Sequence, residues 1–355
     1  MNTHIIELPR MVLIGKNALE KLPDVCREIA TQANILILCD TITREIAGNR
    51  TKEILGKADM DIVADSTAAE VDRIGAKHKF DVVVAVGGGR VIDVAKMVAY
   101  RKRTPFIAVP TAPSHDGIAS ERATISGRDG SKYSLKAKPP VAIVADISIL
   151  KSAPYELIAS GAADVISNYT AVNDWKLARD DNGEYYSEYA AALSLLSSKI
   201  VVKSANMIRG LEEQGIRNLV EALVCSGISM SLVGSSRPAS GSEHAFSHAL
   251  DMLQMKAGAS CSSGSVGRSR ALHGQQCGLG AILMAYHQGQ DWKMVRDSLS
   301  EVGAPVTAEG IGIEKEMIIK ALLEAKYIRK RYTILDKKPL DKKKAEILCK
   351  ATGVF

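Results

Sequence analysis

Residues 82–96 decide the fold class of this chain, and they read Val82-Val83-Val84-Ala85-Val86-Gly87-Gly88-Gly89-Arg90-Val91-Ile92-Asp93-Val94-Ala95-Lys96. The apolar run predicts a buried strand, the three glycines a tight turn, and the remainder a helix. A helix that starts behind glycines presents free N–H groups and a positive dipole end, which suit a pyrophosphate. We therefore expect a nucleotide phosphate at this turn, the alternative being a strand–helix turn that binds nothing.

The same alternation of strand and helix continues on both sides of this stretch. Helical patterns cover residues 19–31 and 68–78, and residues 125–140 contain turn signals that predict a small inserted hairpin. Because the strands are continuous apolar runs separated by helices, they predict a mainly parallel sheet covered on both faces. Five aliphatic runs are predicted as strands, at residues 35–39, 61–64, 82–86, 106–109 and 141–144.

The pattern becomes helical after Asp146. We therefore predict a Rossmann-like α/β dinucleotide-binding domain at residues 1–152 and an all-α metal- and substrate-binding domain at residues 153–355, with a site in the cleft between them. A Gly/Ser-rich segment at residues 256–270 lacks periodicity and predicts a loop. Helices of the second domain are expected at residues 156–175, 184–207, 216–232 and 272–287.

Composition excludes several classes of protein. The net charge of +6 is mild and concentrated near the C-terminus, and only 5% of residues are aromatic, so we expect no nucleic-acid partner. The six cysteines form no C-x-x-C pair, which argues against a disulfide framework and a cysteine-rich zinc site. The chain starts with no signal-peptide pattern, and no uninterrupted apolar run approaches the about 18 residues of a membrane helix. We expect a cytoplasmic protein without a membrane span.

Asp40 follows the strand at residues 35–39, where no G-x-G-x-x-G motif is present. A carboxylate at the end of a strand can accept hydrogen bonds from the ribose hydroxyls of a dinucleotide. It can equally cap the helix that begins at Thr41. The sequence leaves both roles open.

Three histidines and an aspartate are candidates for a metal site, the alternatives being histidines four apart by chance and a solvent-exposed acid. His244 and His248 lie four residues apart on a helix that the capping-box pattern of residues 240–243 starts near Gly241. His273 opens a later helix, and Asp164 lies in an alanine-rich helix. One carboxylate and two imidazoles, with one coordination position left open, form the ligand set of a catalytic zinc.

The loop at residues 109–120 follows another strand and carries hydroxyls, an imidazole and an acid. In open α/β sheets, ligands bind at the carboxyl ends of the strands. We therefore expect this loop to contact a ligand.

Together these segments resemble the iron-type polyol dehydrogenase superfamily, which includes glycerol dehydrogenase and dehydroquinate synthase. Within it, the chain is most similar to the archaeal-type glycerol-1-phosphate dehydrogenase family. The resemblance spans essentially the whole chain, although residues 248–273 are longer than the pattern and Glu121 replaces its proline. It is carried by Gly87 to Gly89 with Asp93 and Lys96, by residues 110–120, by residues 161–164, by residues 236–251 and by residues 272–278.

This resemblance implies a dehydroquinate-synthase-like fold and metal-assisted, NAD(P)H-dependent reduction of dihydroxyacetone phosphate to sn-glycerol 1-phosphate, for membrane phospholipid synthesis. It implies Zn²⁺ ligands Asp164, His244 and His273, and substrate contacts or catalytic roles for Asp116, His248 and Asp164. Implied cofactor contacts are Gly87, Gly88, Gly89, Arg90, Val91, Ile92, Thr111, Ala112, Pro113, Ser114 and Ser120, with Asp40 as the further candidate.

Several alternatives stay open. A glycerol or other polyol dehydrogenase is the nearest, and a lyase of the dehydroquinate-synthase kind is less favoured because its dense set of Lys, Arg and Asn is not recognised here. The choice between NADH and NADPH, the metal in the cell and the state of the expected homo-oligomer are also open. Candidates for holding a substrate phosphate are Arg122, Lys132, Lys136, Lys138 and Arg237.

Overall fold

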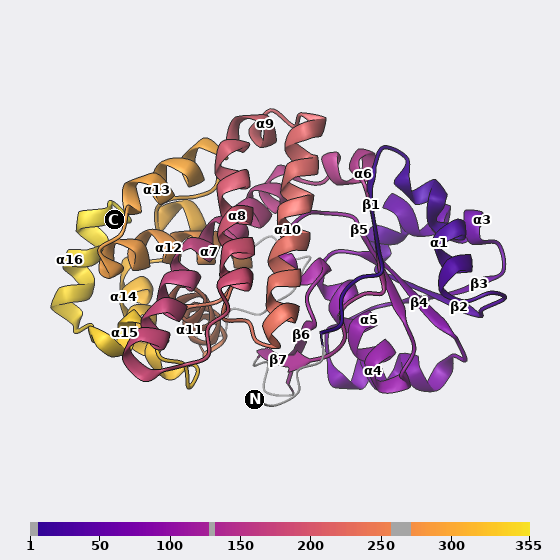
Figure 1. Ribbon diagram of the computed structural model, residues 1–355, viewed down its shortest axis with the longest axis horizontal. Coiled ribbons are helices and arrows are strands. Elements are labelled where there is room, and N and C mark those ends of the chain that lie inside the picture. The colour runs from indigo at the N-terminus through magenta and orange to yellow at the C-terminus, as the bar shows by residue number, and fades with distance from the viewer. Residues whose placement is uncertain (1–5, 128–131, 257–270) are drawn as a thin grey trace.

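The computed structural model describes residues 6–127, 132–256 and 271–355 (Figure 1). The predicted turn at residues 127–130 and the predicted loop at residues 256–270, which holds Cys261, lie almost wholly outside the described residues. In Figure 1 the β-sheet occupies one end of the molecule and a group of helices the other. The helix α10 (Glu213–Val233) stands between them.

A six-stranded sheet forms the N-terminal part, in the order β1-β8-β5-β4-β2-β3, and every pair of neighbouring strands is parallel. This confirms the predicted parallel sheet. Its strands are β1 (Met11–Gly15), β2 (Ile35–Cys39), β3 (Ala58–Ile62), β4 (Val82–Gly87), β5 (Phe106–Pro110) and β8 (Ala142–Asp146).

Both faces of the sheet are covered. Alternate side chains of β4 belong to two different apolar clusters: Val83 packs in the cluster that includes helices α4 (Ala68–Lys77) and α5 (Gly89–Lys102), and Val84 packs in the cluster that includes α1 (Leu22–Ile29). Side chains of a strand alternate between its faces. The continuous apolar runs of the sequence therefore reflect burial on both sides.

Three details differ from the predictions. The edge strand β1 was not predicted, since it is short and its residues are only partly buried. The strand predicted at residues 61–64 begins earlier, at Ala58. The predicted hairpin is confirmed, but its first strand starts at Arg122 rather than in the segment 125–140: β6 (Arg122–Ser126) pairs antiparallel with β7 (Lys132–Lys136).

Described residues after Asp146 contain helices and no strand. The helix predicted at residues 184–207 is two helices, because the chain turns at Ser204. The long helices are α7 (Tyr155–Asn182), α8 (Glu188–Lys203), α10, α11 (Ser242–Lys256), α12 (His273–Gln288), α13 (Trp292–Glu301), α14 (Lys315–Glu324) and α16 (Lys342–Thr352). The short helix α9 (Ala205–Arg209) follows α8. Short helices are η1 (Ala18–Lys21), α2 (Thr41–Thr43), η2 (Arg44–Gly48), α3 (Asn49–Leu55), η3 (Asp116–Ile118), α6 (Ile147–Lys151), η4 (Glu309–Ile311), η5 (Ala325–Tyr327) and α15 (Ile334–Lys337).

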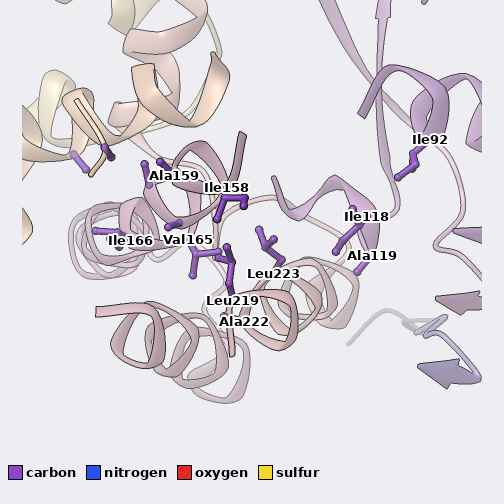
Figure 2. Close-up of a cluster of buried hydrophobic side chains, with 14 of the residues drawn as sticks. Ile92, Ile118, Ala119, Ile158, Ala159, Val165, Ile166, Leu219, Ala222 and Leu223 are labelled. Carbon is purple, nitrogen blue, oxygen red and sulfur yellow. The ribbon is translucent and has the colours of Figure 1, made fainter. Parts of the chain in front are cut away.

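An apolar cluster joins the sheet part to the helical part (Figure 2). It contains Ile92 of α5, Ile118 of the loop after β5, Val165 of α7 and Leu223 of α10, all at most 2% exposed. Apolar burial between the two parts favours a fixed arrangement across the site. The domain boundary at residues 152–153 stays a prediction.

The helix α10 is long and apolar enough, by length and composition, to cross a membrane, with a hydropathy of 1.4 over its most apolar window. The sequence shows no uninterrupted apolar run there because Glu221 and serines interrupt it. In the structure 67% of that window is buried inside the protein, which is typical of a core helix.

Candidate active site

The glycine turn lies where the connections of the sheet diverge. The chain leaves β2 toward β3 at one side and leaves the adjacent β4 toward β5 at the other. Such a switch point, at the carboxyl ends of the strands, is the usual ligand position in open α/β sheets. Gly88 is the N-cap of α5, and a Cβ added to it would meet no atom within 4 Å. The turn therefore leaves open space in front of the helix N-terminus, which fits a nucleotide phosphate.

Asp40 lies beside this turn and caps the following helix, which was one of its two predicted roles. Its Oδ1 accepts hydrogen bonds from the backbone N–H groups of Ile42 and Thr43, and its Oδ2 accepts one from Arg90 at 3.0 Å. Burial opposes ionisation of Asp40, but the bonds from Thr43 and Arg90 outweigh it and lower its pKa. The carboxylate thus joins the ends of β2 and β4 at the switch point.

The other residues predicted to contact the cofactor lie in the cavity, in the apolar core or in the loop after β5. Gly89, Arg90 and Ser120 line a cavity of about 270 Å³. Val91 and Ile92 are fully buried, and their side chains pack in the apolar core, so only their backbone could face a ligand. The loop after β5 runs beside the glycine turn, where the N–H of Thr111 donates to the carbonyl of Gly87, and it continues through Ala112, Pro113 and Ser114.

Two glycines bring the segments of the predicted metal site together. A Cβ on Gly161 of α7 would lie 1.8 Å from the Pro113 carbonyl oxygen, and a Cβ on Gly274 of α12 would lie 1.9 Å from the Ser160 carbonyl oxygen. Only glycine permits these approaches. They bring α7, which carries Asp164, against the loop after β5 and against the start of α12.

Asp164, His244 and His273 converge, as the sequence predicted. The Oδ1 atom of Asp164 lies 3.6 Å from His244 Nε2 and 3.9 Å from His273 Nε2. Ligand atoms of a tetrahedral zinc lie about 3.3 Å apart, given zinc–nitrogen distances of about 2.0 Å. These separations are longer than hydrogen bonds but close to those of ligands around one ion.

The chemistry of the three side chains fits a cation. Asp164 Oδ1 is buried and accepts no hydrogen bond from the described residues. Burial, and next the charge of Asp116, raise the pKa of Asp164 well above its usual value. Burial, and next the charges of Arg329 and Arg331, lower the pKa of His244 to about 3, so its imidazole is neutral as a ligand requires. A metal ion between these atoms would stabilise the buried carboxylate.

The remaining nitrogens of both histidines are held by the protein. His244 Nδ1 lies 3.0 Å from Oε1 of Glu243, a fully buried carboxylate. His273 Nδ1 lies 3.2 Å from the hydroxyl of Ser247. Such partners fix the ring orientation of metal-binding histidines and direct the Nε2 atoms at the ion. The helix α11 begins at Ser242, close to the predicted start, but the two hydrogen bonds of a Ser240–Glu243 capping box are not found among the described residues. Glu243 instead accepts from the N–H of Gly241 at 2.5 Å, and Asp174 accepts from the N–H of Ser242.

Asp116 and His248 flank the three predicted ligands. The hydroxyl of Ser226 donates to Asp116 Oδ2 at 2.9 Å, and burial nevertheless raises the pKa of Asp116 to about 6. His248 Nε2 lies 2.9 Å from Nη2 of Arg329. Because arginine can only donate, this bond requires the lone pair of His248 at Nε2. Both Asp116 and His248 line the cavity together with His244 and His273.

Sequence reasoning missed two residues of this region. Cys277 joins the ligand group, since the ligand atoms of Asp164, His244, His273 and Cys277 all lie within 4.8 Å of one another. Its spacing of four from His273 on α12 was the available signal. Arg329 belongs to the basic C-terminal region of the chain, and no local signal marked it as a site residue.

Comparison with known proteins agrees with this arrangement. Residues 13–154 match the model of the family described as iron-containing alcohol dehydrogenase. A protein of Pyrococcus furiosus named glycerol-1-phosphate dehydrogenase [NAD(P)+] is 47% identical, with 99% of this chain and 100% of the relative covered. The same name belongs to a protein of Methanosarcina mazei that is 45% identical, with 93% and 91% covered. This chain belongs to the glycerol-1-phosphate dehydrogenase family.

Solved structures place the family's fold among the polyol dehydrogenases. Glycerol dehydrogenase from Schizosaccharomyces pombe matches with a TM-score of 0.80 and 19% identity, over 99% of this chain and 91% of that one. A probable glycerol dehydrogenase from Sinorhizobium meliloti 1021 matches with a TM-score of 0.79 and 18% identity, over 99% and 98%. The predicted dehydroquinate-synthase-like class, an α/β part followed by a helical part, is the fold of these iron-type dehydrogenases.

Proposed function

We propose that this chain reduces dihydroxyacetone phosphate to sn-glycerol 1-phosphate with NADH or NADPH, for membrane phospholipid synthesis. The observation that carries the proposal is one cavity in which Gly89 and Arg90, from the phosphate-binding turn, face His244 and His273. The relatives at 45–47% identity share this activity in their names.

Asp164, His244 and His273 would hold a Zn²⁺ ion. When bound, zinc supplies Lewis-acid polarisation of the substrate carbonyl, and the nicotinamide supplies the hydride. The protein's part is to hold the ligand atoms in place before the ion arrives: Glu243 orients His244, Ser247 orients His273 and the N–H of Asp116 orients Asp164.

Asp116 and His248 are proposed to bind and orient the substrate's oxygens. The bond from Arg329 occupies His248 Nε2, so the proton of a neutral His248 is at Nδ1. With a pKa of about 6, Asp116 can accept or donate a proton near neutral pH at the carboxyl that Ser226 holds. We assign the final proton transfer to neither residue alone.

The cofactor is proposed to place its pyrophosphate at Gly87, Gly88 and Gly89. The residues Thr111 to Ser114 and Ser120 would lie along the nicotinamide half, and Asp40 along the adenosine ribose. An Asp40→Ala variant is expected to raise the KM for NADH about 10-fold by removing a ribose acceptor and the Arg90 partner. An unchanged KM for NADH and NADPH would leave Asp40 with its capping role only.

We further propose a cytoplasmic homo-oligomer of two-domain subunits, divided at residues 152–153, with no nucleic-acid partner and no membrane span. Light scattering after gel filtration measures the oligomeric state. Retention on DNA that depends on salt would contradict the absence of a nucleic-acid partner.

The decisive experiment supplies zinc to chelator-treated protein and follows NADH or NADPH oxidation with dihydroxyacetone phosphate and with dihydroxyacetone. We expect oxidation with the phosphorylated ketone that requires the metal, and a product of the sn-glycerol 1-phosphate configuration. Equal or better turnover of dihydroxyacetone would assign the chain to the glycerol dehydrogenases instead. No oxidation with either ketone would overturn the dehydrogenase proposal.

A further inference from the structure

Two arginines face the candidate active site, and within the described part of the chain neither has an acidic partner. Arg122, at the start of β6, donates to the hydroxyl of Ser134 at 3.2 Å and to its carbonyl at 2.7 Å. Arg329, after η5, donates to His248 and, at 3.4 Å, to the hydroxyl of Ser240. Within residues 6–127, 132–256 and 271–355, no carboxylate lies within ion-pair distance of either guanidinium.

The two charges act on each other. Burial, and next the positive charge of Arg122, lower the pKa of Arg329. A half-buried cation held near a second cation costs free energy unless an anion compensates both. The neighbouring Arg331 adds a third positive charge, and its hydrogen bonds to described residues go to neutral oxygens, the carbonyl of Ser240 and the hydroxyl of Ser236. Among the described residues, this part of the cavity thus holds positive charges that no carboxylate pairs at ion-pair distance.

Three of the other basic residues predicted as phosphate-binding candidates form ion pairs with acidic residues. Lys136 lies 3.9 Å from Glu121, Lys138 lies 3.5 Å from Glu7, and Arg237 is bonded to Glu184. The side chain of Lys132 lies outside the described residues. Among the four sequence candidates whose side chains are described, Arg122 alone lines the cavity, and Arg329 lines it as well.

The position of Arg329 suits one part of the substrate. Its guanidinium contacts His248, whose ring centroid lies 5.9 Å from that of the proposed ligand His273. The phosphorus of dihydroxyacetone phosphate is three bonds from the carbonyl carbon. If the carbonyl is held at the proposed metal site, the phosphate therefore comes within reach of Arg329, which is separated from that site by the imidazole of His248.

We propose that Arg329 and Arg122 together bind the phosphate of the substrate and set the preference for a phosphorylated over a neutral ketone. This inference rests on the proposed reaction. Arginine forms paired hydrogen bonds with phosphate oxygens, and two arginines match a dianion. The bond to His248 gives Arg329 a second effect, since it couples phosphate binding to the orientation of that imidazole.

The test compares Arg329→Met, Arg122→Met and Arg329→Lys in zinc-loaded protein, with Lys330→Met as the matched control. Lys330 is the exposed neighbour of Arg329, and its variant removes the same charge. The ratio of kcat/KM for dihydroxyacetone phosphate to that for dihydroxyacetone is expected to fall about 30-fold or more in either methionine variant. It should recover in part in Arg329→Lys and stay at the wild-type value in Lys330→Met.

Inorganic phosphate provides an independent measurement on the wild type. It should compete with dihydroxyacetone phosphate, and this competition should weaken at least 10-fold in a methionine variant. The proposal that Arg329 and Arg122 bind the phosphate is overturned if the kcat/KM ratio is unchanged in both methionine variants. It is also overturned if inorganic phosphate inhibits these variants as strongly as it inhibits the wild type. Wild-type protein that reduces neither ketone would instead contradict the proposed reaction, so the two failures are distinguishable.

Discussion

The backbone N–H of Asp116 donates to Asp164 Oδ2 at 3.1 Å and leaves Asp164 Oδ1 facing His244 at 3.6 Å. The loop after β5 thus orients the carboxylate of α7, and the two oxygens have different partners. One is satisfied by the protein, and the other is buried without a donor among the described residues. The buried Oδ1 of Asp164 is therefore suited to bind a cation, and Oδ2 is suited to hold the carboxylate in place.

Asp164→Asn should remove metal binding. The amide is neutral and nearly the same size, so we expect the zinc affinity to fall at least 100-fold and ketone reduction to be lost. Metal content after dialysis and NADH oxidation measure both effects. Asp180→Asn is the control, because Asp180 lies on the same helix but is exposed. Full metal content with normal activity in Asp164→Asn would refute the ligand role.

Glu243→Gln should weaken the metal site without removing a ligand. Glu243 accepts hydrogen bonds from Thr170 at 2.9 Å and contacts His244 Nδ1 at 3.0 Å. Loss of a carboxylate that orients a ligating histidine typically lowers metal affinity 10- to 100-fold, and we expect a decrease of about that size. Competition with a zinc chelator measures it. The exposed Glu188→Gln should leave the affinity unchanged, and equal affinities in all three proteins would contradict the prediction.

Gly88→Ala should separate folding from cofactor binding. No protein atom lies within 4 Å of the added Cβ, and the φ of Gly88 is −82°, so the fold accommodates alanine. The methyl group would instead occupy the space of the pyrophosphate. We expect an unchanged Tm and a KM for the nicotinamide cofactor raised about 10-fold or more. A variant with the wild-type KM would show that the phosphate does not lie at this turn.

Asp61 should contribute acid-sensitive stability far from the site. It is 8% exposed and accepts hydrogen bonds from His78 at 2.8 Å, Arg73 at 3.1 Å and Lys77 at 3.2 Å. Burial alone would raise its pKa, but these partners lower it to about 2. Because the folded pKa is below the unfolded value of about 3.9, the contribution is present above that value and is lost as the pH falls toward 2.

The expected size is about 2 kcal/mol or less, since Arg73 and Lys77 are partly exposed and screened. Urea unfolding at pH 5, 4 and 3 should show that the stability difference between wild type and Asp61→Asn shrinks as the pH falls. A difference that stays constant over this range would exclude Asp61 as a titrating contributor.

The fold was largely predictable because its signals are local. Strands β2, β4 and β5 were predicted to within one residue, since a strand buried on both faces is a continuous apolar run between turns. The edge strand β1 was not predicted, because a half-exposed strand of five residues has no such apolar run. The break at Ser204 escaped for a related reason: the helical period continues across it.

The site was predictable where a ligand pattern lies within one helix or follows one strand. Asp164, His244, His248 and His273 were selected by residue type and neighbourhood. The resemblance to the family implied three of them as ligands, and the structure brings Asp164, His244 and His273 together. Cys277 and Arg329 were not selected. Nothing in the sequence around Cys277 distinguishes it from an ordinary buried cysteine. Arg329 belongs to a basic segment and lies 81 residues beyond His248, which it contacts.

The sequence by itself therefore determined the order and type of most elements, and it predicted a phosphate-binding turn and a set of candidate metal ligands. These depend on periodicity, backbone freedom and side-chain chemistry over a few neighbouring residues. Only the tertiary structure decided which charges meet. Arg122 and Arg329 come from a hairpin and from the C-terminal tail, yet they face one cavity, and neither forms an ion pair within the described part of the chain. The energy of an electrostatic interaction depends on the distance between the charges and on their burial, and the spacing of residues along the chain determines neither.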